Sequence, residues 1–419
     1  MNVWSIIGVI LVIILFIQFF SRLGKELPLL EMMALIASLQ WIIGPVISYS
    51  SDYQHYRYYM YVPEEEYMSF VVPGLSIFCL ALLYKKPNIT VNDKVFTLFS
   101  DKGKYILLVG ILSDIASIFA PPSLLFFFFI VSQFKFVGAG ILLFSTNKID
   151  RYYFIGGIGY LVFRSLNQAL FHELILWSAF MYLIWALRNK PSNRTIFLTI
   201  GIGIIGLIGL QSVKSAYRDA IKDNENSNKI ALMFSLLSDE WSKSSYDDIE
   251  KEEEEQMVNV RLNQGWIISA IMDYTPEYEP YANGETITTA ISASLLPRFL
   301  FPNKKEAGGQ ENFERFTGLP IDKGTSMGIS IIGEAYANYG VIGGIIFMGF
   351  WGLFLLVIWK FLIKMFIKHP LILFFLPMLF LQVVKAETEF ATVLNHLIKS
   401  CIVLLMFYWF ATKALKWEI

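Results

Sequence analysis

Long apolar runs recur along this chain of 419 residues, and they restrict its fold more than any other feature. Runs of about 17 to 25 apolar residues can cross the hydrocarbon core of a bilayer as helices. The composition agrees, because 55% of the residues are hydrophobic and only 16% are charged. The sequence therefore predicts a polytopic membrane protein. The expected spans lie near residues 3–20, 28–50, 67–84, 104–119, 123–144, 195–211, 328–359, 371–386 and 397–413.

Basic connections set the expected orientation of these spans. Connections rich in Lys and Arg stay on the cytoplasmic side of a membrane, and both 147–151 and 188–194 are basic. For these two connections to share one side, residues 152–187 must cross twice, with 164–173 at the far face. We therefore expect an all-α polytopic membrane protein of about 11 transmembrane helices, with the N-terminus outside and the C-terminus inside. Further basic segments fit this arrangement at 21–26, 85–104, 360–369 and 413–417.

One connection, residues 212–327, is much longer than the rest and is expected to be a large extracytoplasmic loop. It carries 12 Lys and Arg against 20 Asp and Glu, including the acidic run 250–255, which we interpret as a solvated helix face. Apolar residues recur at helical spacing in 258–274 and 284–305, so both segments are expected to be amphipathic helices on the bilayer surface. The loop would separate an N-terminal transmembrane bundle, 1–211, of about 8 spans from a C-terminal bundle, 328–419, of about 3 spans.

Several common chemistries leave no trace in the sequence. It has no glycine-rich phosphate loop and no dinucleotide-binding fingerprint, and its histidines are too scattered to indicate a zinc site. No cofactor, metal ion or nucleic-acid partner is therefore expected. Many coupled transporters carry intramembrane acids and broken helices mirrored in two halves, and that pattern is missing as well. The four histidines are His55, His172, His369 and His396.

The long loop also contains Lys and Arg, although basic residues are expected mainly on the cytoplasmic side. Arg298 lies in "LLPRFLFPNKK", between Pro297 and the aromatic Phe299, and Lys304 and Lys305 follow it. Arginine suits a bidentate grip on phosphate, because its guanidinium is planar, permanently charged and weakly hydrated. The pattern favours an anionic ligand at the membrane surface, although contact with lipid head groups or surface ion pairs is also consistent with it. The other loop arginines are Arg218, Arg261 and Arg315.

Three elements in a fixed order carry a family resemblance. The stretch "GETITTAISASLLPRFLFPNKK" (284–305) resembles a segment of the large outer loop of Wzy-type polymerases, the membrane enzymes that join oligosaccharide repeat units into O-antigen, capsule or exopolysaccharide. Arg298 and Gly309, with ten residues between them, are similar to the arginine motif of that family. The stretch "GTSMGISIIGEAYANYGVIGGI" resembles its return into the membrane, with Glu334, Tyr336, Asn338 and Gly340 at the recurring positions. A second Arg-to-Gly element, present in some members, is not found here.

The resemblance implies a GT-C-like helical architecture and a membrane glycosyltransferase that needs neither metal nor nucleotide sugar. It implies polymerisation of undecaprenyl-diphosphate-linked repeat units at the outer face of a bacterial cytoplasmic (inner) membrane. The implied partners are the lipid-linked glycan donor and acceptor, membrane lipids, a chain-length regulator and a flippase. Two alternatives stay open: an O-antigen ligase-type glycan transferase, and a lipid-linked oligosaccharide flippase or other transporter.

Glycosyl transfer from a lipid diphosphate needs a grip on the leaving group and a base for the acceptor hydroxyl. Arg298 is the expected grip, and Arg218, Arg261, Lys304 and Lys305 would assist it. Glu334 is the expected base, because a carboxylate at the lipid boundary is desolvated; alternatively it only binds backbone groups or an Arg and holds the loop.

Other polar residues on the expected outer face complete the candidate site. His396 and Glu387 are an alternative base and phosphate partner, and a structural hydrogen bond also explains His396. Arg164, His172 and Glu173 are candidates to line the same cavity. Gly309, Tyr336 and Asn338 are assigned to substrate binding by their positions in the family pattern.

Overall fold

A computed structural model describes residues 1–51, 58–89, 91–169, 171–223, 228–243, 262–295, 309–322 and 325–418. Helices make up 77% of the described residues, which form no strand. The prediction of an all-α protein is therefore confirmed. Seven helices in the described part of the chain are long and apolar enough to cross a membrane, which agrees with a polytopic membrane protein. They are Val3–Arg22, Leu29–Ser50, Glu64–Leu83, Leu125–Leu142, Asn193–Ser212, Ile331–Lys368 and Phe390–Lys413.

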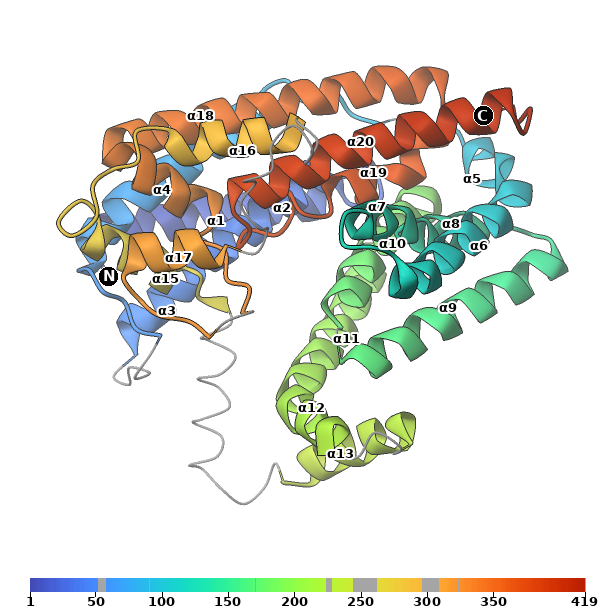
Figure 1. Ribbon diagram of the computed structural model, residues 1–419, viewed down its shortest axis with the longest axis horizontal. Helices are drawn as coiled ribbons and strands as arrows, with labels where there is room; N and C mark the ends of the chain where they lie inside the picture. The colour runs from blue at the N-terminus through green and yellow to red at the C-terminus, as the bar shows by residue number, and fades with distance from the viewer. Residues whose placement is uncertain are drawn as a thin grey trace.

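The first helices pack against the long helix near the C-terminus. α4 lies along α18 for much of its length, and α1 packs on α4 and α2 (Figure 1). A one-turn π-helix, η1, interrupts the second predicted span and leaves the side chain of Gln40 half-buried. The bounds are α1 Val3–Arg22, α2 Leu29–Ser38, η1 Leu39–Ile43, α3 Gly44–Ser50 and α4 Glu64–Leu83.

The middle helices form a second group, drawn from cyan to yellow-green in the centre and at the right of Figure 1. α6 and α8 cross at two glycines: a Cβ added at Gly110 would lie 2.0 Å from the Lys135 nitrogen, and one at Gly138 would lie 2.3 Å from the Leu107 nitrogen. Small residues allow such close crossings in membrane proteins. The bounds are α5 Lys94–Leu98, α6 Ser100–Ala116, η2 Ser117–Phe119, α7 Leu125–Ser132, α8 Phe134–Leu142, α9 Lys148–Gln168, α10 His172–Asn189 and α11 Asn193–Ser212.

Two helices cover the range 152–187: α9 ends at Gln168 and α10 begins at His172, so the break between them falls within 164–173, where the sequence predicts the far face. Together with α6 and α19 they lie where the remaining spans are predicted, although they are not among the seven helices of span length and apolarity. The total of about 11 spans and the sidedness of the connections stay predictions.

Helices of the long connection pack in two places. α12 (Lys214–Asp223) and α13 (Lys229–Lys243) contact each other, α11 and α9, and lie at the bottom of Figure 1. α15 (Gly265–Tyr274), α16 (Glu285–Leu295) and α17 (Gln310–Thr317) instead pack on the N-terminal and C-terminal helices. The acidic run 250–255 lies outside the described residues.

The expectation of a surface helix in 258–274 is wrong for its described part. Every residue of α15 from Gly265 to Met272 is buried, so the helix has no face left for lipid head groups. It packs against α3, η1, α17 and α18. An apolar run of this length fits a core helix as well as an interfacial one, and tertiary packing decides between them.

The C-terminal part contains α18 (Ile331–Lys368), α19 (Ile372–Phe380) and α20 (Phe390–Lys413). α18 is two helices joined at Gly340, whose φ of 65° and ψ of −160° are outside the helical region. A Cβ added at Gly344 would lie 3.3 Å from the Ala335 carbonyl carbon, although nine residues of straight helix span roughly 13 Å. The segment 331–339 therefore folds back on the long part of α18, so Glu334 lies beside that helix and not along its axis.

Candidate functional site

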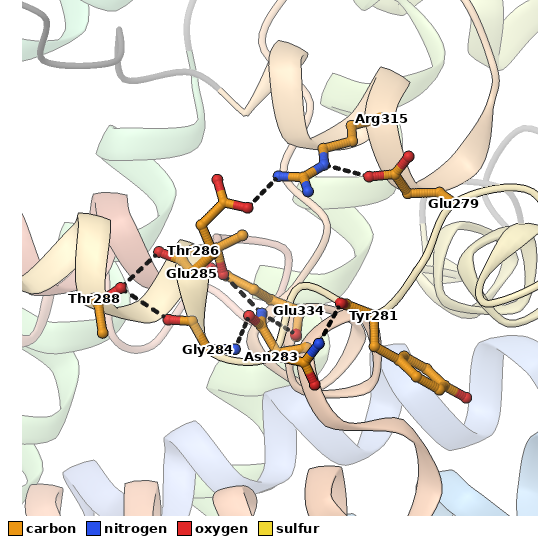
Figure 2. Close-up of polar contacts among 10 residues, drawn as sticks. Glu279, Tyr281, Asn283, Gly284, Glu285, Thr286, Thr288, Arg315 and Glu334 are labelled. Atoms are coloured by element: carbon orange, nitrogen blue, oxygen red, sulfur yellow. Dashed lines mark hydrogen bonds and ion pairs between the residues drawn. The ribbon is translucent and has the colours of Figure 1, made fainter.

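The turn at 281–286 docks on the end of the short segment 331–339, and a buried hydrogen-bond network joins them (Figure 2). The backbone nitrogens of Ala282 and Asn283 donate to the carbonyls of Ala337 and Asn338, each at 3.0 Å. These carbonyls end a helix and have no partner within it. The Gly284 nitrogen donates to Asn338 Oδ1 at 3.0 Å. The family-like segment 284–286 is thereby fixed against the family-like segment 334–338.

Glu334 is fully buried at the centre of this network. The Thr286 hydroxyl donates to Glu334 Oε1 at 2.7 Å, and Asn338 Nδ2 donates to Thr286 Oγ1 at 2.7 Å. The Phe390 nitrogen donates to Glu334 Oε2 at 2.8 Å. Since Phe390 is the first residue of α20, the carboxylate occupies a helix N-terminus, where backbone N–H groups attract negative charge. We call Thr286, Glu334, Asn338 and the Phe390 amide the Glu334 cluster.

A small polar chamber adjoins the Glu334 cluster. Its volume is about 50 Å³, which is room for one or two water molecules. Buried Glu389, the N-cap of α20, lines it and accepts a 3.0 Å hydrogen bond from Asn312 Nδ2. The Oδ1 atoms of Asn312 and Asn395 are buried without a hydrogen-bond partner among the described residues. The lining is Thr286, Thr289, Ala290, Ala293, Gly309, Glu311, Asn312, Glu389, Ala391 and Asn395.

Gly309 lines this chamber at a position that no other residue fits easily. Its φ is 76°, and an added Cβ would lie 2.4 Å from the Met327 carbonyl oxygen. Both facts require glycine. The backbone conformation therefore explains why the predicted Arg-to-Gly motif has a glycine at position 309. Arg298 of the same motif lies outside the described residues, as do Arg261, Lys304 and Lys305.

Arg315, on α17, joins the turn from its exposed side. Its Nε donates to Glu279 at 2.6 Å and its Nη1 donates to Glu285 at 3.1 Å (Figure 2). Burial lowers the pKa of the Arg315 guanidinium, but the two carboxylates outweigh burial and the net pKa lies above its ordinary value. The guanidinium therefore keeps its charge, and both carboxylates are engaged in holding the turn.

A larger cavity, about 510 Å³, lies among the middle helices; we call it the Arg164 cavity. Asp114 Oδ2 accepts from Tyr160 Oη at 2.6 Å, from Arg164 Nε at 3.0 Å and lies 3.2 Å from Lys135 Nζ. The crossing at Gly110 brings α8 close enough for this contact, because Asp114 is one helical turn further along α6. The lining is Asp114, Ser117, Leu125, Phe129, Ser132, Gln133, Lys135, Phe136, Leu161, Arg164, Ser165, Gln168, His172 and Glu173.

The structure brings some predicted residues together and separates others. Arg164, His172 and Glu173 do line one cavity, but it differs from the chamber at the Glu334 cluster. Tyr336 is buried between the rings of Phe70 and Tyr281, at 5.2 and 6.0 Å. Its ring is part of the core.

The remaining outer-face candidates have separate surroundings. Arg218 Nη2 donates to the Ala169 carbonyl at 3.4 Å, next to the end of α9, and α12 lies far from α16 and α18 in Figure 1. Glu387 accepts from Gln40 Nε2 at 3.3 Å. His396 is buried, its Nδ1 lies 3.4 Å from Ser400 Oγ, and its Nε2 has no hydrogen-bond partner among the described residues.

Asp114, Gln133 and Lys135 were missed by the sequence analysis, although a signal for two of them exists. Asp114 and Lys135 are single charges inside predicted spans, and such residues usually pair with each other and mark functional sites. The sequence analysis also missed Glu389, although it named Glu387, two residues earlier, as a candidate site residue. Its place directly before the apolar helix "FATVLNH" is typical of an N-cap region, where acidic residues are favoured.

The helical fold, the span-length helices and the buried polar clusters define a multi-pass membrane protein. Within its described residues, no group of three or more His, Cys, Asp or Glu is placed to hold a metal ion. Residues 254–414 match the family model described as O-antigen polysaccharide polymerase Wzy. This match confirms the resemblance inferred from 284–344, and it includes the Glu334 cluster but not the Arg164 cavity. Searches of the curated proteins and of the solved structures gave no match.

Proposed function

We propose that this protein polymerises undecaprenyl-diphosphate-linked oligosaccharide repeat units into O-antigen, capsule or exopolysaccharide at the outer face of the cytoplasmic membrane. The acceptor hydroxyl attacks the anomeric carbon of the donor sugar. The bond from that carbon to the diphosphate oxygen breaks, the lipid diphosphate leaves, and a base takes the hydroxyl proton. The family match over 254–414 supports the polymerisation of repeat units.

The observation that carries the proposal is that residues on both sides of Arg298 in the sequence line the polar chamber. Ala293 on one side and Gly309 on the other side both line the polar chamber, and Thr286 joins that chamber to Glu334. We assign to Arg298 the grip on the departing diphosphate, because a fixed guanidinium stabilises charge that develops in the transition state. Lys304 and Lys305 belong to the same stretch and would add positive charge.

Two carboxylates at the N-terminus of α20, Glu389 and Glu334, have different roles in this proposal. Glu389 lines the chamber and takes the proton of the acceptor hydroxyl. Both oxygens of Glu334 accept hydrogen bonds from Thr286 and the Phe390 amide, which favours the alternative that Glu334 holds the chamber wall. Glu334 is then a positioning residue.

The first test is complementation of a deletion strain with Arg298→Ala and Arg298→Lys, reading polysaccharide length on gels. A polymerase defect should leave single repeat units exported and attached, with Lys rescuing only partly because it lacks the bidentate fork. Loss of single units from the cell surface would instead indicate a flippase. Long polymer left on its lipid carrier would indicate a ligase.

The second test separates the two carboxylates. Gln at 334 can accept from the Phe390 amide while its amide nitrogen donates to the Thr286 hydroxyl, so Glu334→Gln should retain most polymer. Glu389→Gln should abolish it, because the amide accepts no proton at neutral pH. If the Glu334→Gln protein is stable but makes only single repeat units, Glu334 and not Glu389 is the general base.

A further inference from the structure

The polar chamber is too small to contain a sugar ring, whereas the Arg164 cavity has the size of a small-molecule site. Cavities that bind organic ligands measure about 300–1,000 Å³, and this one measures about 510 Å³ against about 50 Å³ for the chamber. It is lined by residues from α6, α7, α8, α9 and α10, all outside the family match.

Gln133 shows that the cavity is built for a polar occupant. Its side chain is fully buried, and its Oε1 accepts a 2.9 Å hydrogen bond from Trp177 Nε1. That bond fixes the orientation of the amide. Its Nε2 then has no hydrogen-bond partner among the described residues, although it belongs to a residue that lines the cavity. A buried donor without a partner costs about 1–3 kcal/mol, and a ligand oxygen would remove that cost.

Arg164 and Lys135 offer further donors. Arg164 bonds to Asp114 through Nε, and no hydrogen bond of its two terminal nitrogens occurs among the described residues. Lys135 is buried and spends one contact on the same carboxylate oxygen. Because Asp114 fixes both cations from one side, their remaining N–H groups keep fixed positions at the cavity wall.

The charge of the lining selects among polar ligands. Asp114 and Glu173 balance Lys135 and Arg164, so the wall carries little net charge and does not favour an anion. A hydroxyl group both donates and accepts, which suits a wall that offers both kinds of partner. Phe129 and Phe136 supply apolar surface for the carbon face of a ring.

A second cavity on neighbouring helices shows what a lipid-facing site looks like in this protein. It measures about 290 Å³, and its lining contains no charged residue and no amide. Acyl chains suit such a wall, whereas the Arg164 cavity would leave buried charges against hydrocarbon. The lining of this second cavity is Phe127, Val131, Phe134, Val403, Met406, Phe407, Trp409 and Phe410.

We propose that the Arg164 cavity is a saccharide-binding site that holds a neutral sugar of the repeat unit, with Gln133, Lys135 and Arg164 bonding its hydroxyls. The proposal rests on the proposed function. α20 links the two sites, since Asn395 lines the chamber while the ring of the next residue, His396, lies 6.3 Å from Phe129 of the cavity wall. A glycan held in the cavity is thereby close to the helix that carries Glu389.

Titration calorimetry on the full chain in lipid nanodiscs tests the site without requiring turnover. The probe is the oligosaccharide released by mild acid from the lipid-linked repeat units of producing cells. Arg164→Gln should weaken its binding about tenfold, the equivalent of one or two lost hydrogen bonds. The control Lys102→Gln, which removes an exposed ion pair on α6, should leave the affinity unchanged. Equal affinity of Arg164→Gln and the unchanged protein would overturn the proposal.

A second variant blocks the cavity without touching the charges. Ser165 is buried in the lining, so Ser165→Leu places a larger side chain in the open space and should abolish binding. The matched control is Ser178→Leu, because Ser178 is exposed on α10. A folded Ser165→Leu protein that binds the probe normally would contradict the assignment, whether or not Arg164→Gln folds.

Two further titrations separate the alternatives. Inorganic phosphate should not displace the oligosaccharide, and displacement would show an anion site in place of a saccharide site. Arg298→Ala should bind the oligosaccharide as tightly as the unchanged protein does, because the released oligosaccharide lacks the diphosphate that Arg298 is proposed to grip. If Arg298→Ala cells lose single repeat units from the surface, or keep long polymer on its lipid carrier, the proposed function fails while these binding results stand; if Arg164→Gln binds normally, only the saccharide site fails.

Discussion

Glu334 and Asp114 are both buried carboxylates at helix ends, yet they are satisfied in opposite ways. Glu334 accepts from a hydroxyl and a backbone amide, within a network that leaves a chamber of only about 50 Å³ beside it. Asp114 is contacted by Tyr160 and by two cations, Lys135 and Arg164, and the two cations line a cavity of about 510 Å³. The hydrogen bonds to Glu334 hold the turn at 281–286 and the start of α20 in place. The contacts of Asp114 leave Lys135 and Arg164 at the wall of a cavity, where they are available to the proposed ligand.

Under the two proposals, the family-matched region supplies the reaction geometry, while the unmatched N-terminal region supplies the cavity that recognises the glycan. Polymerases for different glycans need the same bond chemistry but different sugar contacts. A division of this kind places the sugar contacts, which must differ between polymerases, in the N-terminal region, which the family model does not match. It is consistent with a family match that begins at residue 254.

Removing the Glu334 carboxylate should have the largest effect on stability. Glu334→Ala leaves the Phe390 amide, the Thr286 hydroxyl and the Asn338 amide without their acceptor or its support, in a fully buried site. We expect a loss of about 3–5 kcal/mol. Glu334→Gln should lose only about 1 kcal/mol. Unfolding of the two purified variants in detergent checks the difference, and similar stabilities would mean that the cluster does not hold the structure.

Asp114→Asn comes next and tests the other side of the comparison. The change leaves Glu173 as the one carboxylate against Lys135 and Arg164 in the cavity lining, but the site borders a cavity that water can enter. We expect a loss of about 2–3 kcal/mol, less than for a fully enclosed pair. Adding Lys135→Met should recover part of it, because Glu173 then balances the one cation that remains. A double variant less stable than Asp114→Asn in the same unfolding assay would show that Lys135 is held by something else.

The sequence predicts the helical class, the turn between α9 and α10 and the family-like segments, because apolar periodicity and motif order are local properties. It does not predict that α15 is enclosed by other helices, since an apolar run alone does not say what covers it. It also placed Arg164 and Glu334 at one cavity, whereas the contacts form two. The separation depends on the Gly110 crossing and the Gly340 reversal, which are tertiary features of single glycines.

Gly340→Ala should break the geometry of the Glu334 cluster without changing any polar group in it. At a φ of 65° and a ψ of −160° an alanine is strained, and its Cβ would lie 3.0 Å from the Tyr281 hydroxyl. We expect a loss of about 2 kcal/mol together with shorter polysaccharide on gels. The control is Gly156→Ala, since no atom lies within 4 Å of a Cβ added there. Equal polymer length in the two strains would mean that the reversal at Gly340 is not needed for the reaction.

The smallest effect is expected at the rim of the Glu334 cluster. Arg315→Gln removes two partly exposed ion pairs, to Glu279 and Glu285, and such pairs contribute about 0.2–1 kcal/mol each. The loss should shrink further when the salt concentration is raised, because salt screens exposed charges. The loss for Glu334→Ala should change little with salt, since the Thr286 hydroxyl and the Phe390 amide that donate to Glu334 are buried and uncharged. If the Arg315→Gln loss is large and independent of salt, the turn at 281–286 depends on its outer ion pairs, and the contrast between an enclosed cluster and a solvated rim is wrong.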